Sequence, residues 1–110
     1  EEGQLSLDVG PADWRNYRTL RLQMISPKAT GARVRLDILG CEEELLGHIV
    51  FPVDWVGANK MQLLLASFEP QNGEERWHLV HALRLSCEQP GSEPTKLILG
   101  AVEVAAEPSA

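Results

Sequence analysis

The chain has 110 residues, a length that suits one domain and is too short for two ordinary hydrophobic cores. Its 44% hydrophobic and 24% charged residues are typical of a globular protein, and no apolar run approaches the roughly 20 residues of a membrane-spanning helix. A net charge of -6 argues against nucleic acid as the main partner, because phosphate binding needs a surplus of lysine and arginine on one face.

The two ends of the sequence suggest a domain taken from a larger chain. The first residue is Glu1 rather than methionine, and the last residues, AAEPSA, have a linker-like composition. We therefore expect a single domain over 1–110, excised from a longer protein, with a core over about 4–104 and a linker-like tail over 105–110. No secretory signal is present, but in an excised domain this says little about location.

Apolar residues alternate with polar ones along almost the whole chain, a period of two that predicts β-strands. No long segment has apolar residues at helical spacing between capping residues, and only 66–79 has room for a short helical turn. In chain order, the predicted strands cover 4–9, 19–25, 33–39, 47–53, 61–68, 81–87 and 96–104.

The connectors between these strands are rich in Gly, Pro, Asn and Ser, as in the segment 26–32. Pro52 is expected to close its strand or to lie at a sheet edge, and Gly100 is expected to mark a bulge where the apolar register shifts. Seven or eight short strands with one polar face predict an all-β fold in which two antiparallel sheets pack as a sandwich, or a jelly roll.

Two cysteines, Cys41 and Cys87, each end a predicted strand. They could form one disulfide or remain as two reduced, buried thiols, and the sequence leaves both possibilities open. The chain has no C-x-x-C pair and no dense cysteine framework, so neither a zinc site nor a disulfide scaffold is expected.

The dipeptide Asp-Trp occurs twice ahead of a predicted strand, as Asp13-Trp14 and Asp54-Trp55. Each aspartate can accept a hydrogen bond from a backbone N–H one or two residues ahead and so fix a turn. Each indole can then cover the open end of the sandwich, while Asn16 and Gly57, at matching places, tolerate left-handed backbone. We interpret the pairs as structural corners, because a sugar-binding platform would account for the tryptophans alone.

The titratable residues do not indicate an enzymatic site. His78 and His81 have the spacing H-x-x-H, but in a strand they would not share a face, and no acidic residue stands at a zinc-enzyme spacing. The glutamates at 42–44 lie in one short connector, whereas glycoside hydrolysis needs two carboxyls across a cleft. We interpret them as a solvated turn and expect a non-catalytic protein without a metal.

Trp77 is the side chain with the most suitable chemistry for carbohydrate. An indole ring can stack on the C–H face of a sugar while its neighbours Arg76 and His78 hydrogen-bond the hydroxyls. The alternative, which we favour, is that Trp77 plugs the sandwich in the same way as the other two tryptophans.

A second candidate site is a row of outward-facing cations on the predicted strands. If these residues shared one sheet, they would form a basic strip able to meet uronic acid carboxylates or sulfates through bidentate pairs. The favoured alternative is cross-strand pairing with Asp37 and surface glutamates. The row consists of Arg21, Arg33, Arg35 and Arg84, with Gln23 beside them.

The segment PADWRNYRTLRLQMISPKATGARVRLDIL, followed by FPVDWVGANKMQLLLASF, resembles a galactose-binding-like β-sandwich domain. Such carbohydrate-binding-module-like domains are accessory parts of heparinase II/III-type polysaccharide lyases and of some glycoside hydrolases. In them an Asp-Trp turn enters a strand, a second Asp-Trp-x-Gly corner opens the strand before Ser-Phe, and a later Trp and a strand similar to HALRLSC complete the pattern. The resemblance covers about 4–104 of this chain.

The resemblance implies a jelly-roll sandwich that holds or orients carbohydrate weakly and packs against the catalytic domain of a secreted or periplasmic polysaccharide-degrading enzyme. It implies no cofactor. A structural calcium is disfavoured, because the last strand has the sequence LILGAVEV where family members carry an acidic pair, although Glu1, Glu2 and Asp8 could supply oxygen ligands elsewhere. The alternative is a purely structural or protein-interaction module that binds no sugar.

Overall fold

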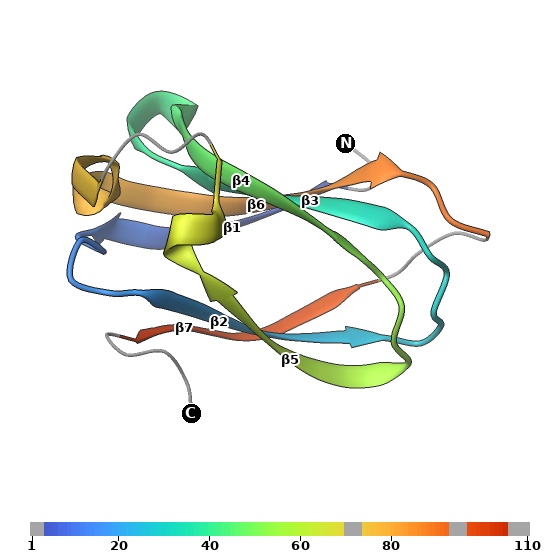
Figure 1. The fold of residues 1–110 in the computed structure, drawn as a ribbon. Helices are drawn as coiled ribbons and strands as arrows, with labels where there is room; N and C mark the ends of the chain where they lie inside the picture. The colour runs from blue at the N-terminus through green and yellow to red at the C-terminus, as the bar shows by residue number, and fades with distance from the viewer. Residues whose placement is uncertain (1–3, 70–73, 93–96, 106–110) are drawn as a thin grey trace.

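A computed structural model describes residues 4–69, 74–92 and 97–105, and Figure 1 shows its ribbon. The strands in these ranges are β1 (Gln4–Ala12), β2 (Thr19–Ser26), β3 (Arg33–Leu39), β4 (Leu45–Pro52), β5 (Gly57–Leu64), β6 (Val80–Gln89) and β7 (Ile98–Ala105). Short 3-10 helices lie between some of them: η1 (Cys41–Glu43), η2 (Leu65–Ser67) and η3 (Glu74–Leu79). No helix among these described residues is long and apolar enough to span a membrane.

The strands form two sheets that stack face to face, and the strand pairings within both sheets are antiparallel. The four-stranded sheet has the order β1-β6-β3-β4, and the three-stranded sheet has the order β5-β2-β7. Figure 1 shows them as an upper and a lower layer, with β4 and β5 in front. This confirms the antiparallel two-sheet sandwich predicted from the alternating sequence.

Consecutive strands cross between the layers at matching positions along the sandwich. β2 leads to β3, β4 leads to β5 and β6 leads to β7, and each of these steps changes sheet. β4 and β5 form the front edges of the two layers (Figure 1). Taking the strands of each sheet in order from that edge, β4 lies over β5, β3 over β2 and β6 over β7. β1 is the last strand of its sheet and has no described strand across from it. Such alternation between two sheets is the arrangement of a jelly roll.

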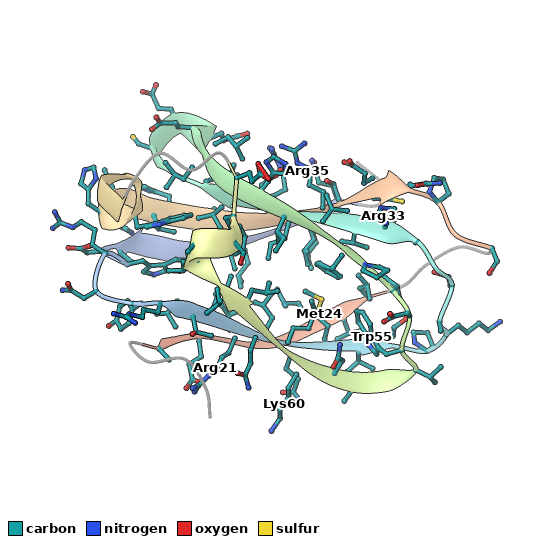
Figure 2. All side chains as sticks on the ribbon, in the orientation of Figure 1. Arg21, Met24, Arg33, Arg35, Trp55 and Lys60 are labelled. Atoms are coloured by element: carbon teal, nitrogen blue, oxygen red, sulfur yellow. The ribbon has the colours of Figure 1, made fainter. Side chains whose placement is uncertain are left out.

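The core lies between the two layers and is made by the inward-facing apolar residues of the alternating segments. Leu20 and Met24 of β2 have 0% of their surface exposed, and Leu36 and Ile38 of β3 have 1% and 0% exposed. Figure 2 shows Met24 between the layers. Burying one such side chain contributes about 1.5–3 kcal/mol, so the alternating segments supply the main stabilisation of the sandwich.

Local features of the strands also follow the sequence. Pro52 ends β4, which is an edge strand, and there it removes no hydrogen bond from the middle of a sheet. The pairing of β2 with β7 shifts between Leu22 and Met24, and Gly100 lies at this bulge. Gly57 begins β5 with a φ of 87°, a left-handed conformation that glycine adopts without a Cβ clash.

One strand prediction was displaced along the chain. The strand expected over 61–68 runs instead over Gly57–Leu64. The backbone N–H of Leu65 donates to the backbone oxygen of Arg18 at 2.8 Å, the last hydrogen bond in register with this pairing, and the chain then turns into η2, where the N–H of Phe68 donates to the oxygen of Leu65 at 3.2 Å. β5 begins with small and polar residues, so the first half of the strand shows no alternation of apolar residues in the sequence.

Candidate functional site

Asp13 fixes a turn ahead of β2. Its Oδ1 accepts a hydrogen bond from the backbone N–H of Arg15 at 3.0 Å, and its carboxylate also accepts from the Arg15 guanidinium at 3.0 and 2.8 Å. The side-chain hydrogen bonds, followed by the backbone one, hold the pKa of Asp13 at about 2, because they stabilise the charged form. Within the described part of the chain, Asp54 makes no comparable hydrogen bond, and Asn16 lacks the left-handed backbone of Gly57.

The two corner tryptophans are buried to different extents. Trp14 is 4% exposed, and its backbone N–H donates to the backbone oxygen of Trp77 at 2.8 Å. Trp55 is half-buried and packs against Phe51, with ring centroids 6.2 Å apart and an angle of 33° between the ring planes. Trp14 is therefore a core side chain, whereas the Trp55 ring retains contact with solvent.

Of the three residues considered for a sugar platform, Trp77 is buried. Trp77 is 9% exposed, and its ring meets Phe68 edge-on at a centroid distance of 6.3 Å. Its ring also fills the space above Gly47, where a Cβ would lie 3.1 Å from the indole. His78 is exposed, and the side chain of Arg76 lies outside the described residues. A stacked sugar needs an open ring face, so the burial of Trp77 argues against a platform and agrees with the favoured interpretation that this ring plugs the sandwich.

The predicted basic row is divided between the two outer faces of the sandwich. Arg21 lies on the three-stranded sheet, where its Nη1 contacts Oε1 of Glu103 at 3.2 Å. Arg33, Arg35 and Arg84 lie on β3 and β6 of the four-stranded sheet. Figure 2 shows Arg33 and Arg35 on the upper surface of the molecule and Arg21 on the lower. The four arginines therefore cannot act as one strip.

Arg35 and Arg84 converge on the carboxylate of Asp37. Nε of Arg35 donates to Oδ1 at 2.6 Å, and Arg84 donates to Oδ2 through Nη2 at 2.9 Å and Nε at 3.2 Å. The side chain of Asp37 is 3% exposed, and those of Arg35 and Arg84 are 32% and 27% exposed. We call these three residues the arginine–aspartate cluster. Its buried carboxylate holds two guanidinium groups in one orientation at the surface.

Strand alternation explains why the cluster lies on the outer face. Val34 and Leu36 of β3 are buried in the core, so the residues between and after them point to the opposite side of the strand. Asp37 lies directly opposite Arg84 in the pairing of β3 with β6. Side chains in such opposed positions share a face and lie about 4.5–5.5 Å apart at Cβ, which brings an aspartate and an arginine into contact.

Small polar side chains surround the cluster on the same face. Ser6, Ser86 and His48 occupy the register positions beside it on β1, β6 and β4. Nδ1 of His48 is buried and has no hydrogen-bond partner within the described residues. Two guanidinium groups share the Asp37 carboxylate, so the three residues carry a formal charge of +1, and the solvated Glu43 carboxylate lies beside Arg84 only. The arrangement can therefore accept an anionic group and hydrogen-bond its neighbouring hydroxyls.

The turn next to the cluster has strained backbone. Glu42 and Glu43 have φ angles of 55° and 59°, and this left-handed conformation costs residues with a Cβ roughly 1–2 kcal/mol each. The backbone N–H of Gly40 donates to the backbone oxygen of Glu44 at 2.7 Å and closes the turn. Oε1 of Glu43 lies 3.6 Å from Nη1 of Arg84, and the Glu43 side chain is 81% exposed. The turn thus brings a solvated carboxylate to the rim of the cluster.

The cysteines and the residues considered as metal ligands can also be located in the ranges that the structure describes. No three His, Cys, Asp or Glu side chains in those ranges come close enough together to hold a metal ion. Cys41 and Cys87 are free and exposed, so neither the disulfide nor the pair of buried thiols is present. Of the suggested calcium ligands, Glu1 and Glu2 lie outside the described residues and Asp8 is exposed on β1.

No protein-family model, curated protein or solved structure matches this chain. The functional assignment therefore depends on the chemistry of the outer face.

Two residues of this face were absent from the predicted site. Asp37 was considered only as a pairing partner for the arginines, and His48 was not among the predicted binding residues. The signal for Asp37 was present in the alternation of Arg33, Arg35 and Asp37, which places three charged side chains on one face of β3. No comparable signal existed for His48, because its neighbours depend on the pairing of β4 with β3.

Proposed function

We propose that this domain is a non-catalytic accessory module that binds carbohydrate weakly through the arginine–aspartate cluster. The observation that supports the proposal is the pair of guanidinium groups, Arg35 and Arg84, held by the buried Asp37. A surface whose polar groups are fixed before the ligand arrives loses less side-chain entropy on binding. The cluster therefore has the preorganisation that a shallow binding face requires.

The charge of the cluster favours an anionic sugar. Asp37 engages Nε of Arg35, and the described part of the chain offers no partner to the two Nη groups of that residue. A guanidinium group can bind a carboxylate or a sulfate with two parallel hydrogen bonds. Because the face is partly solvated, we expect dissociation constants from millimolar to micromolar, or about -4 to -8 kcal/mol.

In this proposal the domain belongs to a larger secreted or periplasmic protein that degrades polysaccharides. The cluster holds or orients the glycan, and another surface of the sandwich packs against the catalytic domain. Calorimetric titration of the protein with an acidic, a sulfated and a neutral oligosaccharide tests the first part. Arg35→Ala or Arg84→Ala should weaken binding of the acidic ligand at least about tenfold, equivalent to 1.4 kcal/mol.

Arg21→Ala is the matched control, because Arg21 also forms a cross-strand ion pair but lies on the opposite outer face. It should leave binding unchanged. An equal loss of affinity in all three variants would contradict the location of the site. A preference for the neutral oligosaccharide would contradict the role of the charge.

A protein-interaction or structural module that binds no sugar is the second candidate. It is favoured by exposed apolar side chains on the three-stranded sheet, where Ile98 is 59% exposed and lies opposite Ile25, which is 38% exposed. Val56, in the connector before β5, is 70% exposed. The absence of heat in every titration, with the fold intact by circular dichroism, would favour this candidate over carbohydrate binding.

A further inference from the structure

Among the described residues, no strand lies beside β7 on the side away from β2, and we call this place the vacant position. Counted from the edge formed by β4 and β5, each strand of the four-stranded sheet lies over one strand of the other sheet until β1 is reached. β7 pairs with β2 alone, so the backbone N–H and C=O groups along its other side face no strand in the described part of the chain. This open edge extends over Ile98–Ala105.

The inner face of β1 is poorly covered at the same place. Leu5 and Leu7 point toward the core side, because they lie opposite Leu85 and Leu83, which are 6% and 2% exposed. Leu5 is nevertheless 43% exposed, and no residue of β1 is fully buried. The apolar row that is buried on β6 is thus exposed at Leu5 and half-buried at Leu7 on β1, while Val9 farther along packs against the core. The three-stranded sheet covers the inner side of β6 with β7, but it has no described strand that covers β1.

We propose that β7 accepts one extended strand of another polypeptide, which becomes the fourth strand of the three-stranded sheet and covers Leu5 and Leu7. An unpaired sheet edge can add a strand through main-chain hydrogen bonds, while the alternate side chains of that strand enter an apolar surface. The site is formed by the edge of β7 and the inner face of β1. It is separate from the arginine–aspartate cluster and does not depend on carbohydrate binding.

The geometry selects a single strand over a second copy of this chain. In a second copy, β6 lies across from β7, just as it does here. If the two β7 edges paired, β6 of the second copy would fall on the place that β1 already occupies. In the antiparallel arrangement that prevails in both sheets, a strand with no sheet layer behind it fits over β1, at the usual spacing of about 10 Å between stacked sheets, and a second copy does not.

The position also sets the chemistry of the incoming strand. Its residues that face β1 must be apolar and must recur at every second position, because side chains alternate across a strand. Its outward residues would lie beside Glu103 on a protein of net charge -6, which favours lysine or arginine there. β7 has 8 residues, so a complementary segment of similar length can pair along all of it.

The test uses the whole 110-residue protein and a synthetic peptide of about eight residues in which valine alternates with lysine. Amide hydrogen exchange measured by NMR should show that alternate amides of β7 exchange at least about tenfold more slowly with the peptide bound. Chemical shift changes should be confined to β7, β1 and their neighbours. A control peptide of the same composition, with its valines grouped at one end, should protect no amide of β7.

Leu5→Lys and Gln4→Lys form a matched pair of variants. Leu5 points toward the vacant position and is already 43% exposed, so the substitution is compatible with folding, whereas Gln4 points to the other face of β1. Leu5→Lys should weaken peptide binding about tenfold, and Gln4→Lys, which adds the same charge, should leave it unchanged. Equal affinities of the two variants, unprotected β7 amides at millimolar peptide, or self-association of the protein in place of peptide binding would each overturn the proposal.

Discussion

The coupling free energy within the arginine–aspartate cluster can be compared with that of a matched ion pair on the opposite outer face. Asp37 lies directly opposite Arg84, and Glu103 lies directly opposite Arg21, so both are cross-strand pairs on an outer face. Their side chains are 3% and 27% exposed in the first pair, and 63% and 37% exposed in the second. A double-mutant cycle to alanine on each pair separates the effect of burial from that of the chemistry.

The coupling free energy should differ between the two pairs. The Asp37 carboxylate is nearly dry and accepts two hydrogen bonds from Arg84, at 2.9 and 3.2 Å. We expect a coupling of about 1.5–3 kcal/mol, the range for hydrogen bonds to charged groups, with hydration of the guanidinium keeping it near the lower end. Arg21 and Glu103 make one contact at 3.2 Å in solvent. Their coupling should be about 0.2–1 kcal/mol.

Urea unfolding followed by far-ultraviolet circular dichroism measures these values. For a small protein the free energy of unfolding changes by about 1–3 kcal/mol per molar urea, so a loss of 2 kcal/mol moves the midpoint by roughly 1 M. Molar salt should abolish the coupling of Arg21 with Glu103 and preserve most of that of Asp37 with Arg84. A coupling below about 0.5 kcal/mol for Asp37 and Arg84 would refute the idea that the carboxylate fixes the guanidinium groups.

Three further perturbations address the corners and the strained turn. Trp14→Ala should lower the free energy of unfolding by about 3–5 kcal/mol, and Trp55→Ala should lower it by less, because the Trp55 ring is only half-buried. Glu42→Gly should raise it by about 0.5–1 kcal/mol, since glycine adopts a φ of 55° without a Cβ clash. The hydrogen bonds from Arg15 lower the pKa of Asp13 from 3.8 to about 2, so the ionised carboxylate stabilises the turn above pH 3.8 and loses this effect as the pH falls through about 2. Arg15→Ala should raise this pKa toward 3.8, as followed by an NMR titration of the carboxyl carbon.

Each of these expectations can be contradicted by a simple result. Equal losses for Trp14→Ala and Trp55→Ala in thermal unfolding would mean that the two rings are buried to the same extent in solution. A lower melting temperature for Glu42→Gly would mean that the turn does not strain this residue. An Asp13 pKa that is the same with and without the Arg15 side chain would mean that their hydrogen bonds do not persist.

The alternation of apolar residues was enough to predict the sandwich. Leu20 and Met24 share a face of their strand whatever strand lies beside it, because side chains of a strand alternate between its two sides. Arg21 and Arg35 have the same local pattern, yet they lie on opposite surfaces of the molecule. Which strands share a sheet is decided by contacts between distant segments, so the division of the basic row could not be predicted from the pattern.

Burial was also hard to predict where side chains from two strands meet. Asp37 faces outward, but it is 2% exposed because arginine side chains from β3 and β6 lie over it. Trp77 follows a polar segment and lacks the alternating neighbours of a strand, and its burial depends on Phe68 from another part of the chain. The burial of Asp37 therefore needed the tertiary structure, whereas the burial of Trp77 was the favoured interpretation of the sequence and only its partner, Phe68, was not predicted.

The order of the strands has a consequence for how the chain folds as it leaves the ribosome. In the described part of the protein, β3 and β4 are the only sequence neighbours that pair within a sheet. Among the described strands β1 pairs with β6 alone, so β1 stays single until β6, far along the sequence, has emerged. Closing such long loops before any contact forms is entropically costly, and folding in about milliseconds to seconds is expected. During that interval the nascent chain exposes an apolar strand that a chaperone can hold.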